Sequence, residues 1–211
     1  MKFKVCGLKD PENIKQVASL HPDMLGFIFH PGSSRFVGNE LIIPPIDASI
    51  KKVGVFVNAK PSYIIDMIEE HQLDMIQLHG SESPALCEVM SHLVTVIKAF
   101  GIDESFNFKM LQPYYGTCQY FLFDTKTSLY GGSGTSFDHS ILKRYEGETP
   151  FFLSGGIDEA TISNFQLQIP AMSGFDLNSK FETSPGIKNI ALLHPILSAS
   201  PYSFQPKKIR S

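Results

Sequence analysis

Short apolar runs recur along nearly the whole chain, and polar turns separate them. Each run has the length of a strand. The run at 24–29 is apolar at nearly every position, which is typical of strands covered on both faces, as in parallel sheets. Eight such runs are found, at residues 2–8, 24–29, 52–58, 75–80, 95–100, 120–125, 151–157 and 173–179. The pattern therefore predicts eight buried strands.

Apolar residues at helical spacing follow most of these runs. Helix starts are marked by residues that can cap a helix, three of them followed by proline. These residues are Asp10, Ser83, Asp158 and Ser184. We expect the last helix to begin at Ser184-Pro185 and to reach Leu197. Weaker helical patterns occupy 106–111 and 138–145, and the segment 38–49 is too rich in proline for a good helix.

The alternation of strands and helices predicts the fold class. It implies an α/β protein with a parallel sheet and right-handed crossovers. Eight such units in one domain is the count of the (βα)8 TIM barrel, and a doubly wound open sheet is the alternative. No internal linker is visible, so we expect residues 1–211 to form a single domain, with 198–211 as a C-terminal tail.

Composition and charge narrow the class of protein. The chain is 43% hydrophobic and 18% charged, so it can bury a sizeable core, and its net charge of -3 without a basic stripe argues against nucleic-acid binding. No apolar run approaches the roughly 20 residues that cross a bilayer, so no membrane span is expected. Three cysteines without metal-ligand spacing favour a reducing compartment. We expect a cytoplasmic protein, and a monomer rather than a dimer because no long apolar surface stripe stands out.

Polar side chains and glycines stand at the ends of the predicted strands. In a TIM barrel the carboxyl ends of all strands meet on one face, which holds the active site. The candidates on this ground are Cys6, Arg35, Asn58, Gln77, His79, Asp124, Gly155, Gly156, Asn178 and Ser179. No second His or acid stands at ligand spacing from His79, so no metal site is predicted.

Two of these residues suit acid–base chemistry. Cys6 is either a small buried hydrophobe, the commonest fate of a free cysteine, or a reactive thiol, and its position does not decide between the two. Asp124 follows a run of apolar and aromatic residues and precedes a long loop. The role of a site acid is therefore favoured over that of a cap for the loop.

Glycine-rich turns and one arginine suit substrate binding. The loop at 131–134 suits a mobile lid. Gly155-Gly156 and Asn178-Ser179 follow strands seven and eight, whose loops commonly hold phosphate in this barrel, although ordinary turns are the alternative. Arg35 could bind a substrate carboxylate through its guanidinium fork or pair with a surface acid.

Several segments form a specific pattern in a fixed order along nearly the whole chain. They are 4–8, 35–37, 53–56, 77–80, 123–124, 131–134, 137–138, 154–156, 175–179, Glu182 and 185–186. This pattern resembles the phosphoribosylanthranilate isomerase family of tryptophan biosynthesis. The resemblance implies an Amadori rearrangement of a phosphosugar substrate, N-(5-phosphoribosyl)anthranilate. Because that reaction needs no redox step and no electron sink beyond the iminium, no cofactor is implied.

The resemblance also implies roles for individual residues. Cys6 corresponds to the general base and Asp124 to the general acid, while Arg35 corresponds to the arginine that faces the anthranilate carboxylate. The expected substrate-binding residues are Arg35, Gln77, His79, Gly132, Gly155, Gly156, Asp176, Asn178 and Ser179. Two positions depart from the family's pattern: His139 stands where tryptophan often follows Phe-Asp, and Lys180-Phe181 replaces a small, glycine-containing pair.

Two other functions compete with this interpretation. The imidazole-carboxamide isomerase barrel of histidine biosynthesis performs the same rearrangement, but it is expected to use two carboxylates, whereas this chain has a cysteine on the first strand. A phosphate-binding barrel without chemistry is the non-enzymatic alternative. The presence of both Cys6 and Asp124 argues against it.

Overall fold

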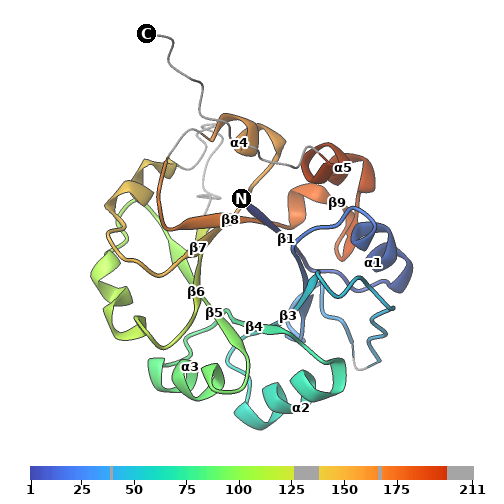
Figure 1. Cartoon of the computed structure of the whole chain (residues 1–211), viewed down its shortest axis with the longest axis horizontal. Helices are drawn as coiled ribbons and strands as arrows, with labels where there is room; N and C mark the ends of the chain where they lie inside the picture. Colours follow the sequence, from blue (N-terminus) through green and yellow to red (C-terminus); the bar gives the residue numbers. More distant parts are fainter. Residues whose placement is uncertain (39, 126–137, 166–167, 199–211) are drawn as a thin grey trace.

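Eight parallel strands close into a barrel in the computed structural model, which describes residues 1–38, 40–125, 138–165 and 168–198 (Figure 1). Each strand pairs with the next along the chain, and the eighth pairs with the first. The strands are β1 (Lys2–Cys6), β2 (Met24–Ile28), β3 (Lys51–Phe56), β4 (Met75–Leu78), β5 (Thr95–Ile102), β6 (Tyr120–Thr125), β7 (Phe151–Ser154) and β8 (Met172–Leu177). The predicted (βα)8 TIM barrel is confirmed.

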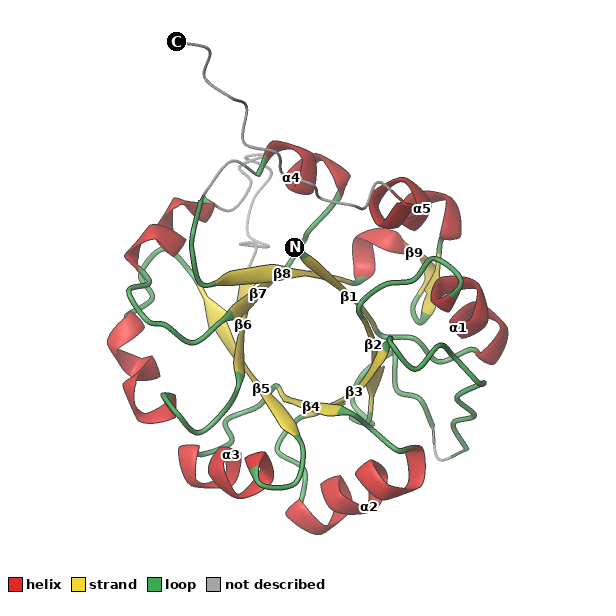
Figure 2. Ribbon diagram, viewed as in Figure 1, coloured by secondary structure: helices red, strands yellow, loops and turns green. Residues whose placement is uncertain are grey.

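Helices surround the barrel and connect most pairs of strands (Figure 2). The α-helices are α1 (Pro11–Ala18), α2 (Pro61–His71), α3 (Pro84–Ser91), α4 (Glu159–Asn164) and α5 (Ile190–Ser198). Three 3-10 helices are η1 (Phe108–Tyr114), η2 (His139–Arg144) and η3 (Ser179–Phe181). As the proline content predicts, no helix forms in the described part of 38–49.

The capping residues read from the sequence begin three helices. The Asp10 carboxylate accepts a hydrogen bond from the Asn13 amide at 2.8 Å, and the Asp158 carboxylate accepts one from Thr161 at 2.7 Å. The Ser83 hydroxyl likewise accepts from the Leu86 amide. Each bond satisfies an amide that the first helical turn leaves without a partner.

The weaker helical patterns are 3-10 helices instead of α-helices. Asn107 and Asp138 precede η1 and η2, and each side chain accepts a hydrogen bond from the amide two residues on. That local bond favours a tight turn over a regular α-helical start. Pro113 lies inside η1 and removes a backbone donor there.

The prediction of a helix starting at Ser184-Pro185 is wrong. Ser184 ends the short strand β9 (Glu182–Ser184), which pairs antiparallel with β10 (Ile187–Lys188), and α5 begins only at Ile190. Gly186 turns the chain between the two strands at φ 91°, a conformation that favours glycine. A Ser-Pro pair opens turns as readily as helices, and here the pairing of the buried Lys188 with Glu182 accompanies the hairpin.

Two apolar layers form the core. One lies between the strands and the helices, and it includes a cluster of aromatic rings such as Phe123, Tyr145 and Phe151. The other fills the inside of the barrel with Met24, Val53, Met75, Ile97, Ala99, Leu122 and Phe152. The inner layer consists of residues on β2 to β7, and the polar residues at the strand carboxyl ends lie above it.

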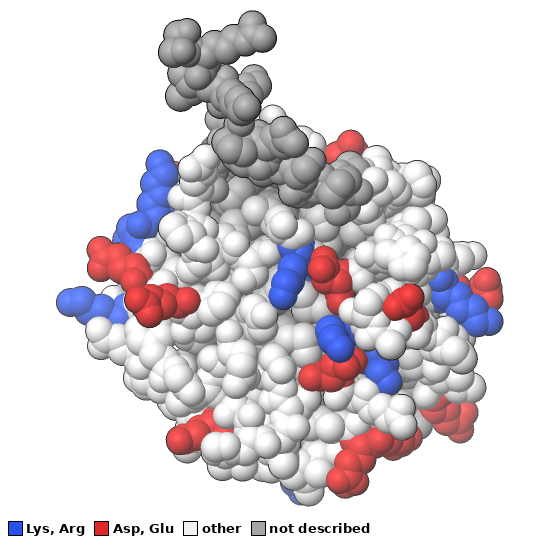
Figure 3. All heavy atoms as spheres, in the orientation of Figure 1, with Lys and Arg blue, Asp and Glu red and all other residues white. Residues whose placement is uncertain are grey.

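Acidic and basic side chains are interspersed on the face seen in Figure 3. This distribution agrees with the small net charge of -3. Among the helices that the structure describes, none combines the length and the apolar character that a bilayer crossing requires.

Candidate active site

A cavity of about 230 Å³ opens at the carboxyl ends of the barrel strands. Of the predicted site residues that the structure describes, all except Asn58 lie on its wall. The lining includes Cys6, Arg35, Gln77, His79, Asp124, Gly155, Gly156, Asp176, Asn178 and Ser179. Gly132 and the predicted lid at 131–134 lie outside the described residues. Asn58 does not line the cavity, because its side chain accepts hydrogen bonds from Ser81 instead.

Cys6 ends β1 and is 3% exposed. Its register partner on β2 is Gly26, and a Cβ atom at that position would lie 2.8 Å from the Cys6 sulfur. Glycine therefore leaves the space that the Cys6 side chain occupies inside the barrel. Burial raises the pKa of the thiol, and the Lys4 ammonium opposes that rise.

A chain of hydrogen bonds leads from β4 to β6 across the cavity wall. The Gln77 amide lies 2.6 Å from His79 Nδ1, and His79 Nε2 lies 3.3 Å from the Asp124 carboxylate. With the Gln77 nitrogen as donor, Nδ1 accepts and the proton of the neutral imidazole is on Nε2, facing Asp124. The imidazole thus orients the Asp124 carboxyl group, whose side chain is 38% exposed.

Glycine is required where the chain leaves β7. Gly155 and Gly156 have φ values of 91° and 65°. A Cβ on Gly155 would come within 2.5 Å of the Thr125 amide nitrogen, so a larger residue cannot fit there. Thr125 also fixes this turn, because its hydroxyl donates to the carbonyls of Ser154 and Gly155 at 3.0 and 2.8 Å.

Arg35 pairs with an acid, which is one of the two alternatives that the sequence leaves open for it. Its Nε lies 2.9 Å from Glu182 Oε1, and its Nη2 lies 2.6 Å from Oε2. Glu182 is largely buried and also accepts from Lys188 Nζ at 2.7 Å, while Lys188 Nζ reaches Asn178 Oδ1 at 2.8 Å. The partner is therefore not a surface acid but a buried one, which pairs both with Arg35 on the cavity wall and with the buried Lys188.

Burial and charge act in opposite directions on this cluster. Burial alone raises the pKa of Glu182, but the hydrogen bonds from Arg35 and Lys188 outweigh it and hold that pKa below its usual range. Burial lowers the pKa of Lys188 against the opposing effect of Glu182.

Asp176 lines the cavity but has a protein partner of its own. Its Oδ1 lies 3.0 Å from Lys4 Nζ, and both side chains are almost fully buried. Sequence reasoning missed Lys4, Lys188 and the pairing of Glu182. The available signal was a lysine, Lys4, in a strand that is otherwise mostly apolar.

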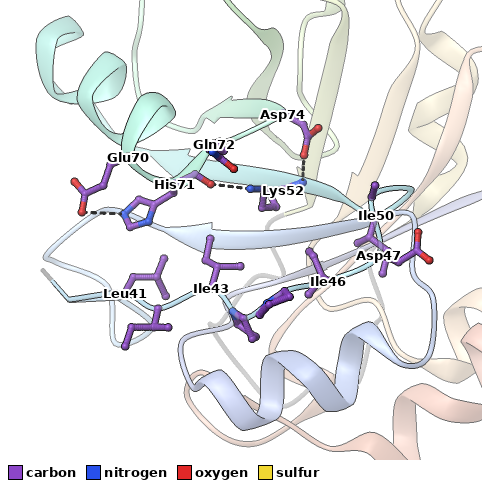
Figure 4. A pocket seen from close by; sticks show the side chains of 14 residues that line it. Leu41, Ile43, Ile46, Asp47, Ile50, Lys52, Glu70, His71, Gln72 and Asp74 are labelled. Carbon is purple, nitrogen blue, oxygen red and sulfur yellow. Dashed lines mark hydrogen bonds and ion pairs between the residues drawn. The ribbon is translucent and has the colours of Figure 1, made fainter.

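A larger cavity of about 760 Å³ lies elsewhere, between the second crossover and the end of α2 (Figure 4). Residues 41–48 form one wall, and Glu70, His71 and Asp74 stand on the other side. The side chain of Lys52 contacts the His71 carbonyl at 2.8 Å. This cavity adjoins the amino ends of β3 and β4, at the end of the barrel opposite the one that holds active sites in this fold.

These features define a class of protein. A closed (βα)8 barrel carries a thiol and a histidine-oriented carboxyl group on the wall of one cavity at the strand carboxyl ends, beside a glycine turn after β7. This is the arrangement of a barrel enzyme that moves protons on a small substrate.

Comparisons with known proteins agree with that class. The chain matches the family described as N-(5'phosphoribosyl)anthranilate (PRA) isomerase over residues 3–199. The N-(5'-phosphoribosyl)anthranilate isomerase of Parabacteroides distasonis is 44% identical, over 92% of this chain and 95% of the relative. The phosphoribosyl anthranilate isomerase structure from Thermus thermophilus has a TM-score of 0.77 at 27% identity, covering 94% of this chain and 97% of that one.

A further solved structure is a phosphoribosyl anthranilate isomerase in complex with reduced 1-(o-carboxyphenylamino)-1-deoxyribulose 5-phosphate. It has a TM-score of 0.71 at 28% identity and covers 94% of this chain and 97% of that one. The chain belongs to the phosphoribosylanthranilate isomerase family, whose members are enzymes of tryptophan biosynthesis.

Proposed function

We propose that the chain converts N-(5-phosphoribosyl)anthranilate to 1-(2-carboxyphenylamino)-1-deoxyribulose 5-phosphate, with Cys6 as general base and Asp124 as general acid. The observation that carries the assignment of roles is the presence of both groups on one cavity wall, from β1 and β6. No other pair of a thiol and a carboxyl group lines that cavity apart from Cys6 with Asp176, and Asp176 is already paired with Lys4.

The two groups divide the reaction between them. Asp124 protonates the furanose ring oxygen, so that the C1–O bond breaks and the ring opens to a Schiff base. Cys6 as thiolate then removes the proton from C2, and the electrons of that bond reach the iminium nitrogen to give an enolamine. The enolamine tautomerises to the ketone by gaining a proton at C1 and losing one from the C2 hydroxyl. The electron pair never leaves the substrate, so the chemistry needs no cofactor.

His79 and Gln77 hold the acid in place. His79 Nε2 faces the Asp124 carboxyl group, and Gln77 fixes the other ring nitrogen. Gln77 Oε1 is buried without a hydrogen-bond partner among the described residues. We assign it to a substrate hydroxyl, since an unpaired buried acceptor is costly unless the ligand supplies its donor.

Arg35 contacts the anthranilate carboxylate through only part of its guanidinium group. Glu182 occupies Nε and Nη2, and within the described residues Nη1 has no acceptor. Nη1 is the donor that we assign to the substrate carboxylate. The buried Glu182 thus holds the arginine in one orientation. The arginine then offers the substrate carboxylate one donor, where an unpaired guanidinium would offer two.

The phosphate is assigned to the side of the cavity formed by the loops after β7 and β8. Gly155 and Gly156 stand there with Asn178, Ser179 and Lys180. Lys180 departs from the family's pattern, and its place on the cavity wall gives the phosphate a cationic partner. Asp176 lines the same cavity with its Oδ1 paired to Lys4, and we keep it among the proposed substrate-binding residues.

We also propose that the protein is a single-domain monomer in the cytoplasm. The exposed large apolar side chains of the described residues are scattered over different elements, among them Ile42, Val89, Met110 and Leu192. All three cysteines are free and buried, as suits a reducing compartment. Light scattering of the purified protein tests the monomer, and a mass of two chains would overturn it.

Turnover of freshly generated phosphoribosylanthranilate by the purified protein tests the reaction, with rescue of a tryptophan auxotroph that lacks this step as a second readout. We expect conversion and rescue. If the protein leaves that substrate unchanged but converts the histidine-pathway aminoaldose, the function is that of the imidazole-carboxamide isomerase instead.

A further inference from the structure

A buried ion pair lies directly beneath Cys6. Lys4 and Cys6 are two residues apart on β1, so both side chains point into the barrel. Lys4 Nζ lies 3.0 Å from Oδ1 of Asp176, its register partner on β8, and the two side chains are 0% and 4% exposed. Replacing a buried ion pair by apolar side chains often costs no stability. Stability alone therefore does not account for a pair placed just above an otherwise apolar barrel interior.

The Lys4 ammonium also lies next to the Cys6 sulfur. A Cβ atom built on Gly26 would be 2.8 Å from Cys6 Sγ and 3.1 Å from Lys4 Nζ. The Cys6 sulfur and the Lys4 ammonium nitrogen are therefore within about 6 Å of each other. At that distance a positive charge strongly favours the ionised form of the thiol. The charge of the ammonium therefore opposes the burial that raises the pKa of the Cys6 thiol.

Other charged groups around Cys6 come from three further elements. Asp176 on β8 opposes the thiolate, while Lys188 on β10 and Arg35 in the loop after β2 favour it. Lys188 and Arg35 are both paired with Glu182, which offsets their charge. His79 and Asp124 line the same cavity as Cys6. Lys4 is the strongest of the groups that favour the thiolate, against the burial that disfavours it.

We propose that Lys4 is a positioning residue that sets the proton affinity of Cys6, and that Asp176 holds the Lys4 ammonium beneath the sulfur. This role deepens the proposed function, since it rests on Cys6 being the general base. Before proton transfer the ammonium stabilises the thiolate. When Cys6 has taken the C2 proton and become a neutral thiol, Asp176 still neutralises Lys4, so no step leaves an isolated charge inside the barrel.

The proposal predicts opposite effects for the two members of the pair. Lys4→Met removes a positive charge, and we expect the titration midpoint of Cys6 to move up by about two pH units, the scale of a unit charge at about 6 Å in an effective dielectric of about 20. Asp176→Asn removes a negative charge but keeps a side-chain oxygen that accepts a hydrogen bond from Lys4, so the midpoint should move down. A role in packing alone would give no such difference in sign.

The experiment measures the rate at which iodoacetamide alkylates Cys6 in the folded full-length protein from neutral to alkaline pH, with mass spectrometry of the Cys6 peptide. The matched control is Lys98→Met, because Lys98 is equally buried and pairs with Glu82 at 3.2 Å on a different part of the barrel. We expect the control midpoint to equal that of the wild type. Circular dichroism checks each fold, and Lys4→Gln serves if Lys4→Met does not fold.

An unchanged midpoint in the Lys4 variant would overturn the proposal, and so would a shift of both variants in the same direction. Alkylation needs no turnover, so this result is independent of the reaction. The role of Cys6 as base fails separately, if Cys6→Ala keeps its activity. The pH profile of kcat/KM for Lys4→Met gives a second readout, and its alkaline displacement is expected to match that of the alkylation midpoint.

Discussion

Replacing Glu182 by glutamine should destabilise the protein and loosen Arg35. The carboxylate is 5% exposed and has two cationic partners, Arg35 at 2.6 Å and Lys188 at 2.7 Å. Removing one partner of a buried pair costs about 3–5 kcal/mol because the other charge stays buried. Arg35 is 22% exposed and can reach water, so the cost comes mainly from Lys188, whose side chain is 0% exposed. We expect a loss of about 3 kcal/mol in the free energy of unfolding.

The loss should also depend on pH. The pKa of Glu182 in the folded protein lies below its ordinary value of 4.5, so its contribution is complete above that value and disappears as the pH falls through the folded-state pKa. The free energy of unfolding of Glu182→Gln should therefore fall furthest below that of the wild type near neutral pH and least in strong acid. KM for the substrate should rise as well, since Arg35 loses its orientation.

Urea unfolding at several pH values, with steady-state kinetics, measures both effects. Glu12→Gln is the matched control, because Glu12 pairs with Lys15 at 3.6 Å on the surface, where an ion pair contributes about 0–1 kcal/mol. If the free energy of unfolding of the Glu182 variant lies within about 1 kcal/mol of that of the control, this carboxylate does not compensate buried cations.

Three further changes probe other parts of the site. Gly155→Ala places a side chain at φ 91° and within 2.5 Å of the Thr125 amide, so the thermal midpoint should fall by several degrees, and an unchanged midpoint would contradict the glycine requirement. Lys180→Ala should raise KM and the inhibition constant of inorganic phosphate several-fold with little change in kcat, whereas equal constants would remove Lys180 from the phosphate site. His79→Ala should lower kcat about ten-fold or more through misorientation of Asp124, and full kcat would show that the acid needs no support.

Much of the fold follows from local pattern. The eight apolar runs became eight strands, and Asp10, Ser83 and Asp158 became caps, because burial on both faces and capping leave signals within a few residues. Ser184-Pro185 wrongly indicated a helix start. A hairpin forms there instead, and it accompanies contacts made through the buried Lys188. Local sequence does not show such contacts.

The site was predictable as far as it depends on topology. Cys6 and Asp124 were expected to meet because the carboxyl ends of barrel strands converge, and both line one cavity. The pairing of Arg35 with Glu182 was not predictable, because 147 positions separate the two residues and either could have faced solvent. Lys4 was visible in the sequence as a charge in a buried strand, but only the structure shows Asp176 beside it.

The measurement that tests the central claim most directly is kcat/KM on phosphoribosylanthranilate for Cys6→Ala and Asp124→Asn, beside Cys118→Ala as a buried cysteine outside the cavity. The account predicts a loss on the order of 100-fold or more for each of the first two variants with the fold intact, the usual scale for removing a general base or acid. The Cys118 variant should turn over substrate like the wild type. Wild-type turnover in either the Cys6 or the Asp124 variant would contradict the account.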